Sequence, residues 1–163
     1  MSAKVKVVPP APDSLEALRE AWGAVALVPK SEESCCARLV DRAGVPAQDE
    51  AKEWLTFMKG LDLVGEAEQG FHRIREDPET VALDERFLRG VYGADALVEL
   101  LDEAGPVDAD AAFDRFEDRV PRWERSHDPD WRSVWRTRVA RLLDWAVLFG
   151  LAERVEGGYV AAA

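Results

Sequence analysis

The sequence predicts a mainly helical chain of the α+β class, in which two similar small domains follow each other, each with three helices and a β-hairpin. Three observations support this. The chain has 163 residues, enough for two small domains. A segment near its middle recurs close to its C-terminal end. Each copy is preceded by residues with the apolar spacing of amphipathic helices.

The internal repeat relates residues 54–71, WLTFMKGLDLVGEAEQGF, to residues 142–159, LLDWAVLFGLAERVEGGY. At an offset of 88 positions, apolar residues fall on apolar residues, and Gly70 falls on Gly158. Each copy contains the end of a helix, a short apolar strand, an acidic turn with glycine, and an aromatic residue that starts a return strand. Glycine supplies the positive φ of a tight hairpin turn. The repeat therefore predicts one β-hairpin in each half.

Apolar residues at helical spacing predict three helices before each hairpin. The predicted helices span residues 14–27, 31–42, 47–61, 94–103, 108–119 and 130–149. Ser14, Asp108 and Asp128 are suitable N-caps because their side-chain oxygens can accept from free backbone N–H groups. Gly44 suits the position just after a helix, where a left-handed conformation is common.

Three helices that end in a hairpin with an aromatic residue on its return strand resemble the winged-helix family. The resemblance is one of element size and spacing, and it covers most of the chain. It implies that the third helix of each domain is a recognition helix and the hairpin a wing. We expect an extended tail over residues 1–12, a first domain over 13–75, a linker over 76–92 and a second domain over 93–163.

The net charge of −11 argues against a general nucleic-acid binder, because phosphate affinity needs basic surface. However, 16 of the 21 basic residues are Arg, and this acidic, lysine-poor composition resembles proteins of salt-loving archaea. In such proteins acidity reflects a salty cytoplasm and says little about partners. No apolar run reaches the roughly 20 residues of a membrane span, and the N-terminus lacks a secretory pattern. We expect a soluble cytoplasmic protein without a membrane partner.

No catalytic, metal or cofactor motif is recognised in the sequence. His72 and His127 have no second ligand at metal-binding spacing. Cys35 and Cys36 are adjacent, so we expect small helix residues of which one faces the core, with a vicinal thiol switch as the alternative. We therefore expect a non-catalytic protein without a cofactor. An enzyme that uses only Asp and Glu stays an open alternative.

The basic concentration of the chain is a group of eight arginines between residues 115 and 141. Arginine suits phosphate contact and guanine recognition. The candidate DNA contacts are Arg132, Arg136, Arg138 and Arg141 on the last predicted helix, with Lys52, Lys59 and Arg73 in the first domain. The arginines of that helix fall on two flanks, however, and pairing with acidic neighbours is equally open. The third helix of the first domain begins with acidic residues, which repel phosphate.

A second candidate surface is Trp123 with Arg122 and Arg125, because Trp and Arg are enriched at protein-interface hot spots. The alternative is a loop tryptophan that closes the second domain. We expect Trp131, Trp135 and Trp145 in the core. Two functions stay open: a DNA-binding transcriptional regulator, with double-stranded DNA as partner, and a protein–protein adaptor with the same fold in a larger cytoplasmic assembly. The sequence predicts no oligomeric state.

Overall fold

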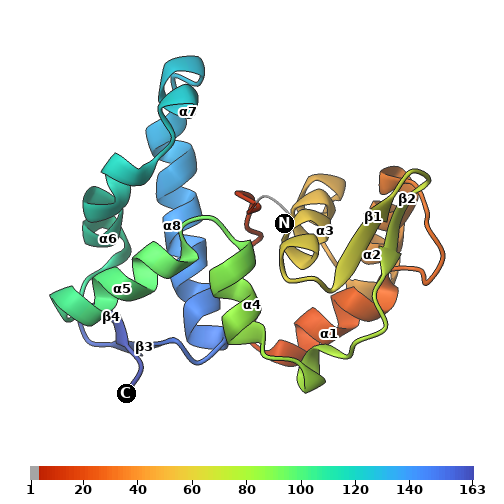
Figure 1. The fold of residues 1–163 in the computed structure, drawn as a ribbon, viewed down its shortest axis with the longest axis horizontal. Coiled ribbons are helices and arrows are strands. Elements are labelled where there is room, and N and C mark those ends of the chain that lie inside the picture. Colours follow the sequence, from red (N-terminus) through yellow and green to blue (C-terminus); the bar gives the residue numbers. More distant parts are fainter. Residues whose placement is uncertain (1–3) are drawn as a thin grey trace. The chain divides into compact units, whose positions relative to one another are not determined.

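The computed structural model describes residues 4–163, which form two compact units, one ending at Tyr92 and the other spanning Gly93–Ala163 (Figure 1). The first unit contains α1 (Leu15–Ala24), α2 (Glu32–Ala43), α3 (Gln48–Gly60), β1 (Val64–Ala67), β2 (Gly70–Arg73), the 3-10 turn η1 (Pro78–Thr80) and α4 (Leu83–Gly90). The second unit contains α5 (Ala94–Ala104), α6 (Ala109–Phe116), the 3-10 turn η2 (Glu117–Arg119), α7 (Arg122–His127), α8 (Trp131–Leu148), β3 (Ala152–Val155) and β4 (Gly158–Ala161).

The helices of each unit pack around one apolar core. In the first unit α2 contacts both α1 and α3, and the buried residues include Leu18, Leu39 and Phe57. In the second unit α8 contacts α5 and α6, with Trp135 and Trp145 fully buried. Burying large apolar side chains such as these is the main force that holds small domains together.

Both predicted hairpins are present and repeat at the offset of 88 positions. Val64 pairs with Arg73 at the open end of the first hairpin, and Ala152 pairs with Ala161 in the second. One isolated antiparallel bridge also joins each hairpin to the chain before the second helix of its unit, between Phe71 and Lys30 and between Tyr159 and Val107. In the first unit the hairpin follows three helices, α1–α3, and in the second unit it follows α5, α6 and α8 with the short helix α7 inserted before α8.

The bridge explains why glycine recurs at one turn position. Gly70 and Gly158 have φ of 129° and 134°, a conformation that L side chains rarely adopt. A Cβ on Gly70 would lie 1.9 Å from the carbonyl oxygen of Lys30, and a Cβ on Gly158 would lie 2.1 Å from that of Val107. Glycine is therefore required by the backbone that crosses each wing.

Two predicted helix starts differ in detail. Asp128 lies outside α8: its Oδ1 accepts from the backbone N–H of Asp130, and this local turn delays the helix until Trp131. Ser14 occupies the N-cap position of α1 without a side-chain capping bond. In contrast, Asp108 caps α6 by accepting from Ala111, as the sequence predicted.

The segment expected as a linker, 76–92, contains η1 and α4 and belongs to the first unit. Phe87 of α4 packs edge to face against Phe57 of α3, with ring centroids 6.3 Å apart. The N-terminal segment is extended but is also packed there, since Val5 pairs with Val91 and Val8 is buried. Apolar side chains in both segments join the core, which explains their ordered packing. Residues 1–3 of the expected tail lie outside the described residues.

The second unit contains an insertion that lengthens the connection between its second and third helices. Helix α6 begins at Ala109, 77 positions after α2 begins at Glu32 (109 minus 32), whereas the wings repeat at 88. The second unit therefore has 11 more residues before the part of α8 that corresponds to α3 (88 minus 77), and η2, α7 and the first turn of α8 occupy this length. Pro121 precedes the short helix α7, which ends at His127.

Candidate nucleic-acid interface

Helix α8 separates its apolar residues from a row of arginines. Its buried residues are Trp135, Val139, Leu142, Leu143, Trp145 and Ala146. The stretch 131–143 contains four arginines and no acidic residue. Arg132 and Arg136 are exposed, whereas Arg138 and Arg141 are half-buried. The helix therefore presents positive charge to solvent along its N-terminal half.

The two exposed arginines are held by both a carboxylate and an aromatic ring. Arg132 Nε lies 2.9 Å from Glu117 Oε1, and its guanidinium lies 4.6 Å from the centroid of the Trp131 ring. Arg136 Nε lies 3.4 Å from Asp110 Oδ1, and its guanidinium lies 4.9 Å from the ring of Phe113. Stacking on a ring restricts a guanidinium while its N–H edges stay available to an acceptor.

Arg138 has a different environment, because it joins α8 to the inserted helix α7. Glu124 Oε1 accepts from Trp135 Nε1 at 3.2 Å and from Arg138 Nη1 at 3.3 Å. The side chains of Arg138 and Glu124 are only 20% and 16% exposed. Water and salt screen a partly buried ion pair less than an exposed one, so such a pair holds its two side chains together more firmly. Arg138 therefore positions α7 against α8.

Helix α7 carries the predicted protein-interface residues, and the structure divides them. The indole of Trp123 is 66% exposed and stacks on the ring of His127, with centroids 4.5 Å apart. Arg122 is also exposed. Arg125 turns inward, where it donates to the carbonyl oxygen of Glu117 and lies 4.8 Å from the ring of Trp131.

Two aromatic predictions have different outcomes. Trp135 and Trp145 are buried, as expected. Trp131 is only half-buried, and the expectation that it lies in the core is wrong. The guanidiniums of Arg125 and Arg132 both approach its ring, so this tryptophan is part of a cationic surface cluster.

The second wing is tied to α8 by one carboxylate. The hydroxyl of Tyr159 donates to Asp144 Oδ1 at 2.5 Å, and Arg154 Nη2 lies 2.6 Å from the same oxygen. Burial is the main cause that raises the pKa of the Tyr159 hydroxyl, and the hydrogen bond to Asp144 raises it further. The neutral hydroxyl therefore holds the wing in its position on the helix.

In the first unit the wing is also tied to the third helix, but here the cation is on the helix and the carboxylate is on the wing. The third helix of this unit also carries less positive charge than α8. Lys59 of α3 lies 2.6 Å from Glu66 of β1, and Lys52 lies 3.9 Å from Glu32 of α2. Arg73 turns back to α1, where its guanidinium lies 5.0 Å from the ring of Trp22. The first turn of α3 is acidic, with Asp49 and Glu50.

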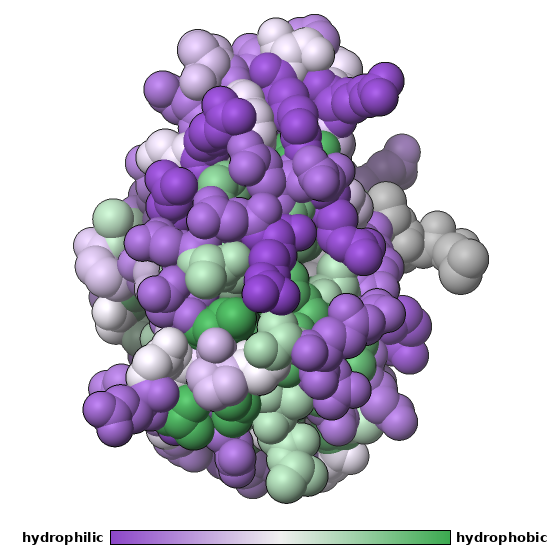
Figure 2. Space-filling view, turned by 90° about the vertical axis from the view of Figure 1, so that its left-hand side faces the viewer, coloured by the Kyte–Doolittle hydropathy of each residue, from purple (hydrophilic) through white to green (hydrophobic). Residues whose placement is uncertain are grey.

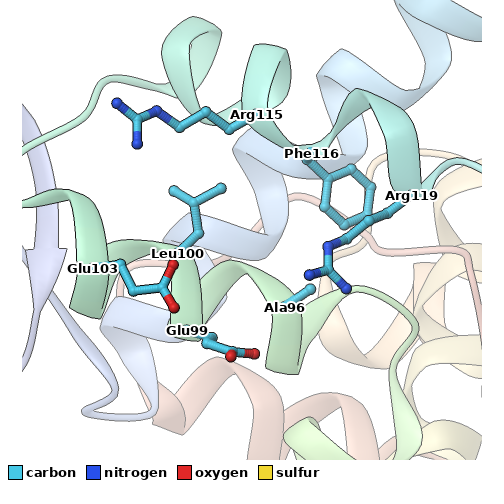
Figure 3. Close-up of a pocket in the computed structure, with 7 residues that line it drawn as sticks. All are labelled: Ala96, Glu99, Leu100, Glu103, Arg115, Phe116 and Arg119. Carbon is cyan, nitrogen blue, oxygen red and sulfur yellow. The ribbon is translucent and has the colours of Figure 1, made fainter.

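Arg115 and Arg119 of the sequence cluster face a groove between α5 and α6 (Figure 3). The groove has a volume of about 260 Å³, and Glu99 and Glu103 of α5 contribute to its opposite wall. The eight arginines thus form at least two groups, at this groove and along α8.

On the face of the second unit in Figure 2, hydrophilic residues cover the upper part around α7.

The carboxylates that organise the α8 arginines were missed by the sequence analysis. Asp110, Glu117 and Glu124 lie 26, 15 and 14 residues before their arginine partners, so no helical spacing relates them.

Within residues 4–163, no group of three or more His, Cys, Asp and Glu side chains is arranged to hold a metal ion. None of the described helices combines the length and the apolar character that a membrane span requires.

A comparison with protein families identified one matching family model, described as the halobacterial double winged helix domain, which covers residues 3–163. Neither a curated protein nor a solved structure gave a significant match. The match spans both units and is consistent with the two wings that follow α3 and α8.

Proposed function

The chain belongs to the halobacterial double winged-helix family, and on that basis we propose that it is a DNA-binding transcriptional regulator. Winged-helix domains commonly bind double-stranded DNA, with the third helix in the major groove and the wing beside it. In this chain the proposed recognition helix is α8 of the second unit. The third helix of the first unit, with its acidic first turn, is the poorer DNA-binding surface.

The observation that carries the proposal is the difference in charge between the two third helices. Residues 131–143 of α8 include four arginines without an acidic residue, whereas Asp49, Glu50 and Glu53 lie in the first half of α3. A helix enters a groove between phosphates, so the sign of its charge decides whether approach is favourable. The acidity of the rest of the chain then limits non-specific binding.

The ion pairs of the α8 arginines do not oppose this function. Arg132 and Arg136 pair at the surface, and exposed ion pairs contribute only about 0–1 kcal/mol. A phosphate can therefore replace the carboxylate of Glu117 or Asp110 at small cost. The rings of Trp131 and Phe113 keep both guanidiniums in place for charge-assisted hydrogen bonds to phosphate oxygens. In this proposal Arg132 and Arg136 are the principal phosphate contacts, Arg141 lies on the other flank of the helix, and Arg138 positions α7.

Fluorescence anisotropy with duplex DNA over a KCl series tests the proposal. We expect the wild-type chain to bind and its affinity to fall as KCl rises, because phosphate contacts release counterions. Arg132→Gln/Arg136→Gln should weaken binding and reduce the slope of log K against log salt by about 2, near 0.9 per lost contact. Lys52→Gln/Lys59→Gln removes the same charge from α3 and should leave both quantities unchanged.

The outcomes separate the proposal from its alternatives. Absence of binding at every KCl concentration, with a folded protein, would exclude the regulator function. Equal losses in the arginine and lysine variants would contradict the assignment of recognition to α8. Circular dichroism and a urea midpoint for each variant keep a folding defect apart from a binding defect.

The exposed indole of Trp123 favours a second function, that of a protein–protein adaptor. Trp and Arg dominate the energetics of many interfaces, and Trp123 and Arg122 both face solvent on the inserted helix α7. For an adaptor, Trp123→Ala should abolish capture of a partner, whereas Arg132→Gln/Arg136→Gln should leave it unchanged. For a DNA-binding regulator we expect the opposite in the DNA assay: Arg132→Gln/Arg136→Gln weakens DNA binding, whereas Trp123→Ala leaves it unchanged.

A further inference from the structure

The first unit carries a pocket that its winged-helix architecture does not use. The pocket has a volume of about 410 Å³ and lies where α1 meets the segment after β2. Its lining residues are Trp22, Leu27, Arg73, Arg75 and Asp77. All of them belong to the first unit, whereas the arginines of α8 belong to the second.

One wall of the pocket contains a guanidinium with unused hydrogen-bonding capacity. Arg73 lies with its guanidinium 5.0 Å from the ring of Trp22, and its Nε is shielded from solvent without a hydrogen-bond partner among residues 4–163. A buried donor without an acceptor is uncommon, because it gives up its bond to water. The indole cannot accept a hydrogen bond, and its own N–H donates to the carbonyl oxygen of Ile74 at 2.9 Å.

The positive charge of the pocket exceeds its negative charge. Asp77 is the acidic residue of the lining. Arg19, which does not line the pocket, forms an ion pair with it, and Arg19 Nη2 lies 2.9 Å from Asp77 Oδ2. The backbone N–H of Glu79 also donates to Asp77, which lowers the pKa of this carboxyl group. Within residues 4–163, neither Arg73 nor Arg75 forms an ion pair. The pocket is therefore lined by two guanidiniums that form no ion pair in the described part of the chain and by one carboxylate that Arg19 already holds.

The remaining wall is apolar and open to solvent. Leu27 is 42% exposed, and the neighbouring Val28 is 60% exposed. Trp22, which also lines the pocket, is half-buried. Large apolar side chains next to unpaired charges are typical of sites that recognise molecules with one polar and one apolar end.

We infer that this pocket binds a small carboxylate that carries an apolar group, with the carboxylate between Arg73 and Arg75 and the apolar group against Trp22 and Leu27. Guanidinium groups pair with carboxylates through two parallel hydrogen bonds, and two of the five side chains that line the pocket carry such a group. A volume of about 410 Å³ falls in the usual range of small-molecule pockets and accepts a ligand such as phenylacetate. The inference does not depend on DNA binding. If the chain is a regulator, the pocket is an effector site.

An NMR titration of the full chain tests the inference, with the indole N–H of Trp22 as reporter. Phenylacetate is the probe, and its controls are phenylacetamide, which lacks the charge, phenethylamine, which inverts it, and acetate, which lacks the ring. We expect saturable shifts of Trp22 with phenylacetate. Each control should bind at least about tenfold more weakly, because a charge-assisted hydrogen bond or a buried ring is lost.

Variants locate the site without disturbing the core. Arg75 is exposed, and Arg75→Gln should weaken phenylacetate at least about tenfold while the protein stays folded. Arg42→Gln, an exposed arginine at the end of α2, is the matched control and should change nothing. Arg73→Lys keeps the charge but loses the fork of N–H groups, and it should also weaken binding.

Three results would overturn the inference. The first is equal binding of phenylacetamide and phenylacetate, which would identify an apolar patch without anion recognition. The second is the same affinity in Arg75→Gln and Arg42→Gln. The third is the absence of saturation by phenylacetate, including the case in which a peptide with a C-terminal Phe saturates, since that would indicate a protein partner. DNA affinity of the same variants reports separately on the proposed regulator.

Discussion

The hydroxyl of Tyr159 on β4 donates to the carboxylate of Asp144 on α8 at 2.5 Å, so the second wing is bonded directly to the helix that precedes it. The equivalent position in the first wing is Phe71, which has no hydroxyl, and there Lys59 and Glu66 make the connection. The two units therefore fix the same relationship of wing to helix with different chemistry. A wing held in this way presents a constant surface next to the helix.

Replacing the hydroxyl should weaken the second unit. Tyr159→Phe removes a donor to a charged acceptor in a partly buried site, and we expect a loss of about 1–2 kcal/mol in the free energy of unfolding. Urea unfolding followed by tryptophan fluorescence measures this loss. A double-mutant cycle with Asp144→Asn should show coupling between the two residues, whereas additive losses would contradict a direct bond.

The same bond predicts a loss of stability at alkaline pH. Burial raises the pKa of Tyr159 in the folded protein above its value of about 10 in an unfolded chain. The neutral form is thus favoured by folding, so its contribution is complete below pH 10 and declines as the pH rises above that value. Urea midpoints at increasing pH should fall more steeply for the wild type than for Tyr159→Phe. Parallel curves would contradict this prediction.

Adjacent glycines in the second wing should differ in their tolerance of alanine. Gly157 and Gly158 both have positive φ, but only Gly158 faces a backbone carbonyl, that of Val107. We expect Gly158→Ala to cost about 3 kcal/mol or more, since strain and a clash with backbone add, and Gly157→Ala about 1–2 kcal/mol. Urea unfolding compares them. Equal costs would show that the approach of Val107 is not required for the wing.

The attachment of α7 should depend on one carboxylate. Glu124→Ala removes the acceptor of both Trp135 and Arg138, and we expect backbone amides of α7 to exchange at least about tenfold faster. Hydrogen exchange with mass spectrometry measures this effect. Glu103→Ala, an exposed residue of α5, serves as control. Unchanged exchange in α7 would mean that packing alone holds this helix.

The two cysteines should be unreactive in the folded protein. Cys35 and Cys36 are both buried, and burial is the main cause that raises the pKa of each thiol. Because the thiolate is the nucleophile, alkylation by iodoacetamide at pH 8 should be at least about 100-fold slower than in urea. Mass spectrometry of time points counts the labelled thiols. Fast labelling of either cysteine in the native state would favour the thiol-switch alternative.

Local sequence determined the elements that repeat. Gly70 and Gly158 mark turns that need positive φ, and Asp108 begins a helix because its side chain reaches a nearby N–H group. Both effects act within a few residues, so the sequence predicted the wings and most helices. The two short helices α4 and α7 were missed, because few turns give a weak periodic signal, and packing decides whether such helices form.

Only the tertiary structure decided the environment of the charged residues. The sequence identified Arg132, Arg136 and Arg138 as candidates but could not relate them to Glu117, Asp110 and Glu124. These three carboxylates come from α6, η2 and the inserted helix α7, which are separate elements that meet the arginines only in the fold. Likewise, the sequence offered Arg73 as a DNA contact, whereas in the structure its guanidinium lies 5.0 Å from the ring of Trp22. Ion pairs and ring contacts depend on distances in space between residues far apart in the chain, and those distances exist only once the core has formed.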